Sequence, residues 1–165
     1  MPGLNQSGNM EAAARRFFRL AKGVEVAAFT VTKEQALDVQ YQLAKETPVD
    51  AAKARSNWRL SVGRPLVGII GPYRPFRSRW RPPYGSGGSK GERSNLNAVR
   101  AQGVLRLATY KKGSIYVSNN VPYINRLNTG WSNQAAPGWI PRAVMSAVLK
   151  TAPKIKKIFN KEFSK

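Results

Sequence analysis

The chain lacks most of the side chains on which enzymes depend. Its 165 residues include no histidine and no cysteine. Ser-His-Asp and Cys-His catalytic arrangements are therefore impossible, and so are zinc sites built from Cys and His. Without cysteine there are no disulfides, and the redox compartment cannot be inferred from the sequence. Only the eight carboxylates and one glycine-rich segment are left as candidates for chemistry.

The carboxylates give little sign of a catalytic site. Six of the eight lie in the first fifty residues, where we expect them on helix surfaces, paired with Lys or Arg one turn away rather than with magnesium. Glu46 and Asp50 are the pair that a metal-dependent nuclease would use, but Pro48 and Asp50 are better explained as turn and cap residues.

The segment GSGGSKGE includes Lys90. It does not have the GxxxxGK[ST] spacing, so a flexible tip is favoured over a phosphate cradle. The sequence predicts no enzymatic activity, no metal site and no cofactor.

Positive charge is the strongest global feature. The chain has 28 Lys and Arg against 8 Asp and Glu, a net charge of +20. The first fifty residues carry 6 of each sign, so the whole excess lies in residues 51–165. A chain so unbalanced repels itself unless an anion lies nearby, and nucleic acid is the commonest such partner. An acidic protein neighbour, or a charged surface that only maintains solubility, is the alternative.

The segment YRPFRSRWRPPY, residues 73–84, alternates arginines with aromatic side chains. Guanidinium groups hold phosphates, and aromatic faces stack on bases or on Arg. An arm lying across a neighbouring subunit explains the segment equally well. Contact with duplex DNA would be to phosphates, without sequence readout. The candidates for contact with DNA or a partner are Arg74, Arg77, Arg79, Trp80, Arg81, Lys154, Lys156 and Lys157.

Two helices are predicted in the first third of the chain. The first covers 9–22, where Met10, Ala14, Phe17 and Ala21 recur at helical spacing, and it stops at Gly23. The second covers about 30–46, with a capping box at Thr32 and Gln35. The preceding GVEVAAF is either a short strand or an earlier helical turn, and one longer helix from about residue 24 is favoured. Pro48 then ends the helix, and Asp50 caps a short helical turn. Alternating residues predict a half-buried strand over 56–62, with Trp58, Leu60 and Val62 on its inner face.

The rest of the chain mixes loop, helix and strand. Residues 64–93 are rich in proline and predict an extended basic loop or arm, in which LVGII is a candidate short strand. Ser94 caps a helix in which Leu96, Val99, Gly103 and Leu107 lie in one line. SIYVSN predicts a second strand, with Ile115 and Val117 on one face. The last helix begins near Pro141, breaks or kinks at Pro153, and ends in a basic amphipathic tail, 151–165. Val144, Val148 and Leu149 are expected to face inward.

These elements predict an α+β fold in a single domain, 1–165, with several helices packed on a small antiparallel sheet. The chain has no apolar run near the length of a membrane span, on the order of 20 residues. Its first residues lack the apolar core and cleavage site of a secretory signal. We therefore expect the protein in the cytoplasm where it is made, or in an assembly formed there.

Two segments together resemble the tail-completion or neck protein family of tailed bacteriophages. They are TPVDAAKARSNWRLSVG at 47–63 and IYVSNNVPYINRLNTGWSNQAAPGWIPRAV at 115–144. The family pattern is a PVDTG-like turn followed by RxNW and a strand, and later IYxxNNxPY, LExGWS and a lead-in to the last helix. The matching residues are Pro48, Val49, Asp50, Arg55, Asn57, Trp58, Tyr116, Asn119, Asn120, Pro122, Tyr123, Leu127, Gly130, Trp131 and Ser132.

The chain departs from the family pattern at several positions. Ala51 and Ala52 stand where the family usually has Thr-Gly, and Asn128 stands where Glu is common. AAPG replaces Ala-Pro-Ala-Gly, and the loop at 64–93 is richer in proline and arginine. These changes leave the expected fold intact, but they limit how far subunit contacts can be transferred.

The resemblance implies a structural virion protein that forms a ring at the head–tail junction, as a neck, tail-completion or tail-terminator subunit. Such a ring would have 6 or 12 copies, contact portal or adaptor and tail proteins, and surround the channel through which DNA passes non-specifically, away from any membrane. The alternative is a free nucleic-acid-binding protein outside the virion. The subunit-interface candidates are Asn119, Asn120, Pro122, Tyr123, Trp131 and Trp58; for Tyr123 and Trp131 a place in the monomer's own core is the competing explanation.

Overall fold

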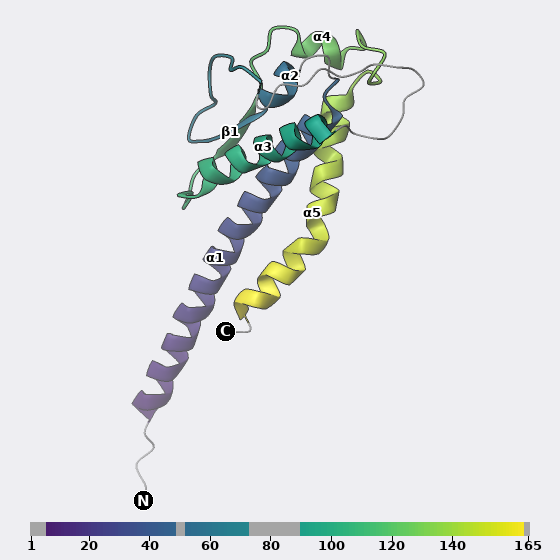
Figure 1. Ribbon diagram of the computed structural model, residues 1–165. Coiled ribbons are helices and arrows are strands. Elements are labelled where there is room, and N and C mark those ends of the chain that lie inside the picture. The colour runs from purple at the N-terminus through teal and green to yellow at the C-terminus, as the bar shows by residue number, and fades with distance from the viewer. Residues whose placement is uncertain (1–5, 49–51, 73–89, 164–165) are drawn as a thin grey trace, which may run out of the picture.

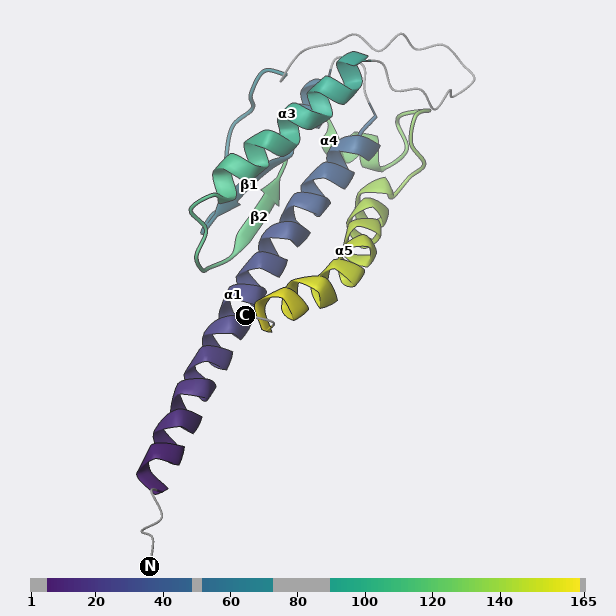
Figure 2. The ribbon, with the colours of Figure 1, turned by 60° about the horizontal axis from the view of Figure 1, so that its bottom comes forward.

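The computed structural model describes residues 6–48, 52–72 and 90–163. The described part forms helices packed with one two-stranded antiparallel sheet, which confirms the predicted α+β fold. In both ribbon views α5 runs along α1, while α3 and the sheet pack on other sides of the C-terminal half of α1 (Figures 1 and 2). In chain order the elements are α1 (Gln6–Glu46), α2 (Lys53–Ser56), β1 (Arg59–Val62), α3 (Lys90–Leu107), β2 (Ile115–Ser118), α4 (Ile124–Asn128) and α5 (Trp139–Phe163).

Helix α1 is continuous over 41 residues. The predicted stop at Gly23 and the predicted capping box at Thr32 and Gln35 are therefore wrong. Thr32 lies inside the helix, where its Oγ1 donates to the carbonyl of Ala28 at 2.8 Å. A glycine in a helix interior costs only about 1 kcal/mol relative to alanine. Packing along α5 outweighs that cost, because Gly23 lies beside Phe163 at the end of α5.

The two halves of α1 have different surroundings. From Ala27 onward the helix is partly or fully covered by the rest of the chain, whereas the described side chains from Met10 to Lys22 are all exposed. Figures 1 and 2 show this N-terminal half projecting away from the other elements. We refer to residues 6–24 as the arm and to the remaining described residues as the body.

The core is centred on two tryptophans. Trp58 and Trp139 meet edge to face with ring centroids 6.2 Å apart, and both are buried. The indole N–H of Trp58 donates to Thr47 Oγ1 at 2.8 Å, which fixes the end of α1 to the start of β1. The buried side chains around them come from five helices, α1 to α5, and they include Leu43, Ala44, Ala54, Leu96, Val99, Ile124 and Ala143.

Helix α3 approaches α1 closely at Gly103. The predicted line of Leu96, Val99, Gly103 and Leu107 is buried, which confirms the helix and its inner face. A Cβ on Gly103 would lie 2.1 Å from Oε1 of Gln40 on α1, so only glycine fits at this crossing. The helix begins at Lys90 rather than after Ser94, and the predicted cap at Ser94 is therefore wrong.

The two strands pair in register, with Leu60 opposite Val117 and Val62 opposite Ile115. The predicted alternation along β1 fails at Val62, which was expected on the inner face and is 40% exposed at the end of the strand, and at Arg59, which is only 7% exposed. The loop that follows β1 covers this face, and the guanidinium donates to the carbonyls of Val67 and Gly68 at 3.1 and 2.5 Å. The candidate strand LVGII is irregular, because these bonds hold it as a loop.

Helix α5 turns a face of small residues toward the core. Trp139, Ala143, Ala147 and Thr151 are buried, whereas the expected inward residues Val148 and Leu149 are 37% and 66% exposed. The prediction is wrong for Val148 and Leu149, because small side chains let α5 lie close to α1, and it is confirmed for Val144, which is partly buried against the core. Pro141 lies in the first turn, as predicted, and Pro153 lies inside a continuous helix whose axis bends in its second half (Figure 1).

We expect opposite effects from the same substitution at two helical glycines. G103A should lower the free energy of unfolding by about 1–3 kcal/mol, since the methyl group overpacks the contact with Gln40. G23A should raise it by up to about 1 kcal/mol, since its Cβ meets only ordinary contacts and alanine favours helix. Urea denaturation measures both, and similar effects at the two sites would contradict the close approach of α1 and α3.

Candidate interaction surfaces

The asparagines of the motif segments hold the chain's own backbone. Asn57 is fully buried; its Nδ2 donates to the carbonyls of Lys53 and Ile70, and its Oδ1 accepts the Ile70 N–H at 2.9 Å. Asn119 Nδ2 donates to the Ala54 carbonyl at 2.8 Å, and its Oδ1 accepts the Val121 N–H. Asn119 therefore has a role within the fold, and its predicted place at a subunit interface stays a prediction.

Asn120 is exposed, but it too serves the fold. Its Nδ2 donates to the carbonyl of Leu66 at 2.5 Å and to that of Gly68 at 3.2 Å. The loop after β1 is thus hydrogen-bonded at Ile70 by Asn57 and at Leu66 and Gly68 by Asn120. These hydrogen bonds attach residues 63–72, which form no helix or strand, to the rest of the chain.

Ala52 gives a physical reason for the glycine of the PVDTG-like turn. It precedes α2 with φ 59°. Among the residues that the structure describes, no other non-glycine residue has a positive φ. The left-handed region costs a residue with a Cβ roughly 1–2 kcal/mol, and glycine avoids that cost. The alanine keeps the turn despite this strain because the residue is 1% exposed and packs in the core. Asp50, the predicted cap, lies outside the described residues.

Asn128 joins α4 to α5. Its Oδ1 accepts the N–H of Ile140 in the first turn of α5 at 3.0 Å, and its carbonyl accepts the N–H of Gly138 at 2.7 Å. The Trp139 indole N–H donates to the Leu127 carbonyl at 3.1 Å. The start of α5 is therefore capped from a distant segment, a contact that no local sequence pattern signals.

The predicted interface tryptophans have opposite environments. Trp58 is 6% exposed, so its place in the core corrects the prediction that it lies at an interface. Trp131 is 76% exposed, and the Arg126 guanidinium lies over its ring at 5.4 Å from the centroid. Tyr123 is 41% exposed beside the exposed Pro122. The structure thus leaves Trp131, Tyr123 and Pro122 available to a partner and excludes the monomer's core for Trp131.

The arginine-rich candidates Arg74, Arg77, Arg79, Trp80 and Arg81 lie outside the described residues. The lysine candidates lie on α5. Lys154 Nζ forms an ion pair with Asp38 on α1 at 2.5 Å, so part of its charge is compensated. Lys156 and Lys157 are exposed.

The arm carries an exposed apolar surface. Met10 is 75% exposed, Phe17 70%, Phe18 72% and Leu20 54%. The helical spacing of Met10 and Phe17 predicts a helix, but helical periodicity does not reveal whether the partner of its apolar side lies in the same chain. Its ion pair between Glu11 and Arg15, at 2.5 Å, confirms the expected pairing of carboxylates with basic residues one turn away.

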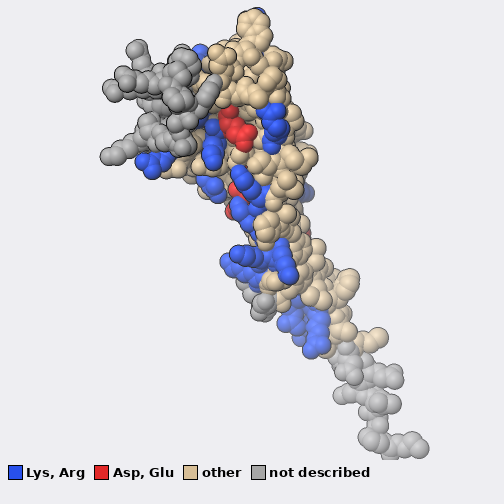
Figure 3. All heavy atoms as spheres, turned by 90° about the vertical axis from the view of Figure 1, so that its right-hand side faces the viewer, with Lys and Arg blue, Asp and Glu red and all other residues tan. Residues whose placement is uncertain are grey.

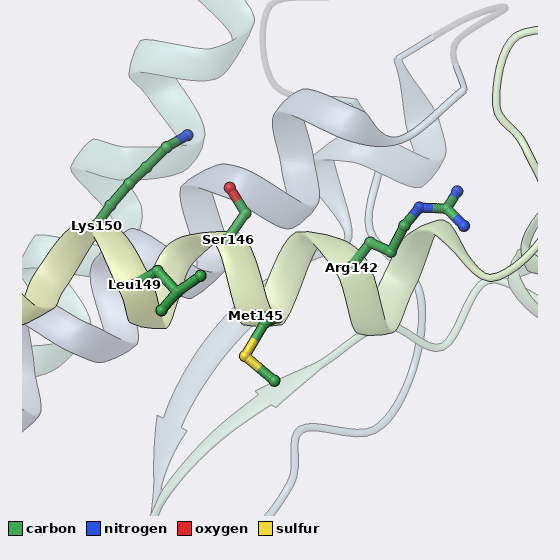
Figure 4. Close-up of a pocket in the computed structure, with 5 residues that line it drawn as sticks. All are labelled: Arg142, Met145, Ser146, Leu149 and Lys150. Carbon is green, nitrogen blue, oxygen red and sulfur yellow. The ribbon is translucent and has the colours of Figure 1, made fainter.

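A second apolar surface lies on the outer side of α5. Met145 and Leu149 are 61% and 66% exposed and line a shallow hollow with Ser146. Arg142 and Lys150 flank this hollow at its two ends (Figure 4). It is an open surface rather than an enclosed cavity.

The nuclease alternative receives no support from the described carboxylates. Glu46 accepts a hydrogen bond from Gln42 Nε2 on its own helix, while Asp50 lies outside the described residues. In residues 6–48, 52–72 and 90–163, no three His, Cys, Asp or Glu side chains gather in a way that would hold a metal ion. No helix in this part of the chain has both the length and the apolar character to cross a membrane.

Comparison with known proteins gives no relative: no family model, no curated protein and no solved structure matches the chain. What the chain does must therefore be argued from its own residues.

We expect the two tryptophans to separate folding from association. W58A should lower the free energy of unfolding by about 3–5 kcal/mol, because it empties the centre of the core. W131A should change it by no more than about 0.5 kcal/mol, because this ring has no core contacts. Chemical denaturation of the dilute chain provides the comparison. A large destabilisation by W131A would assign Trp131 to the fold instead of an interface.

Proposed function

We propose that this chain is a structural virion protein of a tailed bacteriophage. Copies of it would form a ring at the head–tail junction, as a neck or tail-completion subunit around the DNA channel, without transforming a substrate. The two motif segments support the proposal, since they resemble that family in sequence and in order. The observation that carries it is the uncovered apolar arm.

The apolar residues of the arm follow a helix-pairing pattern. Met10, Ala13, Phe17, Leu20 and Val24 alternate spacings of three and four residues, which is the seam that two packed helices share. The pattern continues into Ala27, which is 0% exposed. The seam is therefore uncovered along the arm and becomes covered by the body at Ala27.

Exposure of this seam is costly in water. Full burial of a Leu, Val, Phe or Met side chain contributes about 1.5–3 kcal/mol. Four such residues of the seam, Met10, Phe17, Leu20 and Val24, are at least 47% exposed. A partner helix or groove would recover much of this free energy. A neighbouring copy of the same chain supplies that partner at fixed stoichiometry, as a closed ring requires.

The motif segments fit the same assembly. Trp131 and Tyr123 are rigid aromatic anchors on the surface, of the kind enriched where proteins meet. They lie on the segments after β2, whereas the arm extends from the opposite end of α1 (Figure 1). Two separate interaction surfaces on one chain favour head-to-tail association, in which one surface of each copy contacts the other surface of the next. Such contacts generate a ring when the rotation between copies closes.

The arm should control assembly. F17D places a charge in the middle of the uncovered seam, so the weight-average mass in sedimentation equilibrium should fall toward that of the monomer. L105D is the matched control, because Leu105 is 66% exposed and Phe17 is 70% exposed, but Leu105 lies on α3 away from the arm. A wild-type chain that stays monomeric at micromolar concentration, or equal effects of the two variants, would contradict association through the arm.

The proposed location has its own test. Mature virions of the phage that encodes the chain should contain it in a fixed number of copies, 6 or 12 for a ring, and a cryo-EM map should show it between portal and tail. Quantitative mass spectrometry of purified particles measures the copy number. Its absence from mature particles, together with DNA binding by the isolated chain, would establish the free nucleic-acid-binding protein instead.

A further inference from the structure

Helix α5 carries a row of lysines along one side. Lys150, Lys154, Lys157 and Lys161 are spaced by four, three and four residues, which places them on one face of a helix of 3.6 residues per turn. At a rise of about 1.5 Å per residue, the row spans about 16 Å. We refer to these four residues as the lysine row.

Negative charge is scarce around the row. Helix α5 contains six Lys and Arg and one carboxylate, Glu162. The carboxylate of Asp38 on α1 compensates the charge of Lys154. The same carboxylate also accepts a hydrogen bond from Thr151 Oγ1 at 3.1 Å. Lys157 and Lys161 are exposed and form no ion pair among the residues that the structure describes. The positive field of the row is therefore largely uncancelled within the chain.

The positive surface continues beyond α5. Phe163, at the end of α5, lies beside Gly23 of α1, and the arm beyond Gly23 carries Arg15, Arg16, Arg19 and Lys22. Figure 3 shows Lys and Arg side chains down this side of the molecule, from α5 to the N-terminal half of α1, with few acidic residues between them. The long axis of the protein is thus lined with cations.

We infer that the lysine row binds the phosphate backbone of duplex DNA. This inference rests on the proposed function, because it names the surface that a subunit turns toward the DNA in the channel. A line of like charges matches a polyanion whose charges are also regularly spaced, one per about 1.7 Å of duplex axis. Lysine ammonium groups act as point charges and give contacts without sequence readout, as passage of a whole genome requires.

The residue type favours DNA over an acidic protein. Lysine is depleted in protein–protein interfaces, where Arg, Met and aromatic residues are enriched. The lysine row has four lysines and no arginine. The apolar side chains of α5, Met145 and Leu149, line the separate hollow on its outer side (Figure 4). The row therefore has the composition of a phosphate-binding surface. The apolar hollow does not have that composition.

The test compares two triple variants of the full chain. K150Q/K157Q/K161Q removes three members of the row and keeps Lys154, whose ion pair belongs to the fold. R106Q/K111Q/K112Q removes three exposed cations near the end of α3 and the turn before β2. Each variant lowers the net charge from +20 by three. Fluorescence anisotropy with a labelled random-sequence DNA duplex, at several salt concentrations, gives the slope of log K against log salt.

Each phosphate contact contributes about 0.9 to that slope. The row variant should therefore show a slope smaller by about 2–3 than the wild type, while the control variant keeps the wild-type slope. An equal decrease of the slope in the two variants would mean that only net charge matters. An unchanged slope in the row variant would mean that the row does not contact DNA. Competition by polyglutamate as strong as that by unlabelled duplex would assign the row to an acidic protein. Each of these results overturns the inference.

Failure of the inference and failure of the proposed function remain distinguishable. Sedimentation of the row variant reports assembly independently of DNA. A variant that assembles like the wild type but shows an unchanged salt slope would refute the lysine row and leave the ring intact. A wild-type chain that binds DNA through the row but never assembles would refute the ring and retain the row.

Discussion

One buried side-chain amide, that of Gln40, connects α1 with the start of β1 and with α3. Gln40 of α1 is 1% exposed; its Nε2 donates to the carbonyl of Trp58 at 2.9 Å, and its Oε1 lies against Gly103 of α3. Trp58 in turn packs on Trp139 of α5. Contacts that begin at Gln40 therefore connect α1 with α3, with the start of β1 and with α5. A polar group in so dense a core specifies geometry that apolar packing alone would leave adjustable.

The same helix that organises the core also leaves it. From Ala27 onward, α1 is the surface on which α3, α5 and the sheet pack, and before Gly23 its apolar seam is uncovered. A partner that covers the arm is therefore connected to the core through an uninterrupted backbone. The lysine row lies on α5, which packs along that same helix, so the surfaces proposed for subunits and for DNA are both attached to α1.

The sequence predicted the type of most elements because their apolar residues repeat at regular intervals. The line from Leu96 to Leu107 and the alternation of Ile115 and Val117 are examples. It failed where tertiary contacts override local signals: packing carries α1 through Gly23, and a loop buries Arg59. The surface roles of Trp131 and the core role of Trp58 were not separable either, since both motifs place a tryptophan beside polar residues and only the fold decides which one is covered.

The isolation of the arm has a consequence for when it becomes ordered. A helical segment of about 15 residues is only marginally stable by itself in water, and most helical stability in proteins comes from tertiary packing. Before a partner covers it, the arm has little besides its own backbone bonds and its continuity with the body. Its amides should then exchange with solvent far faster than those around Gln40, and fraying there adds an entropic cost to association. Assembly would thus begin as a local coil-to-helix transition, and its rate would follow helix propensity in residues 6–24 as much as the shape of the finished interface.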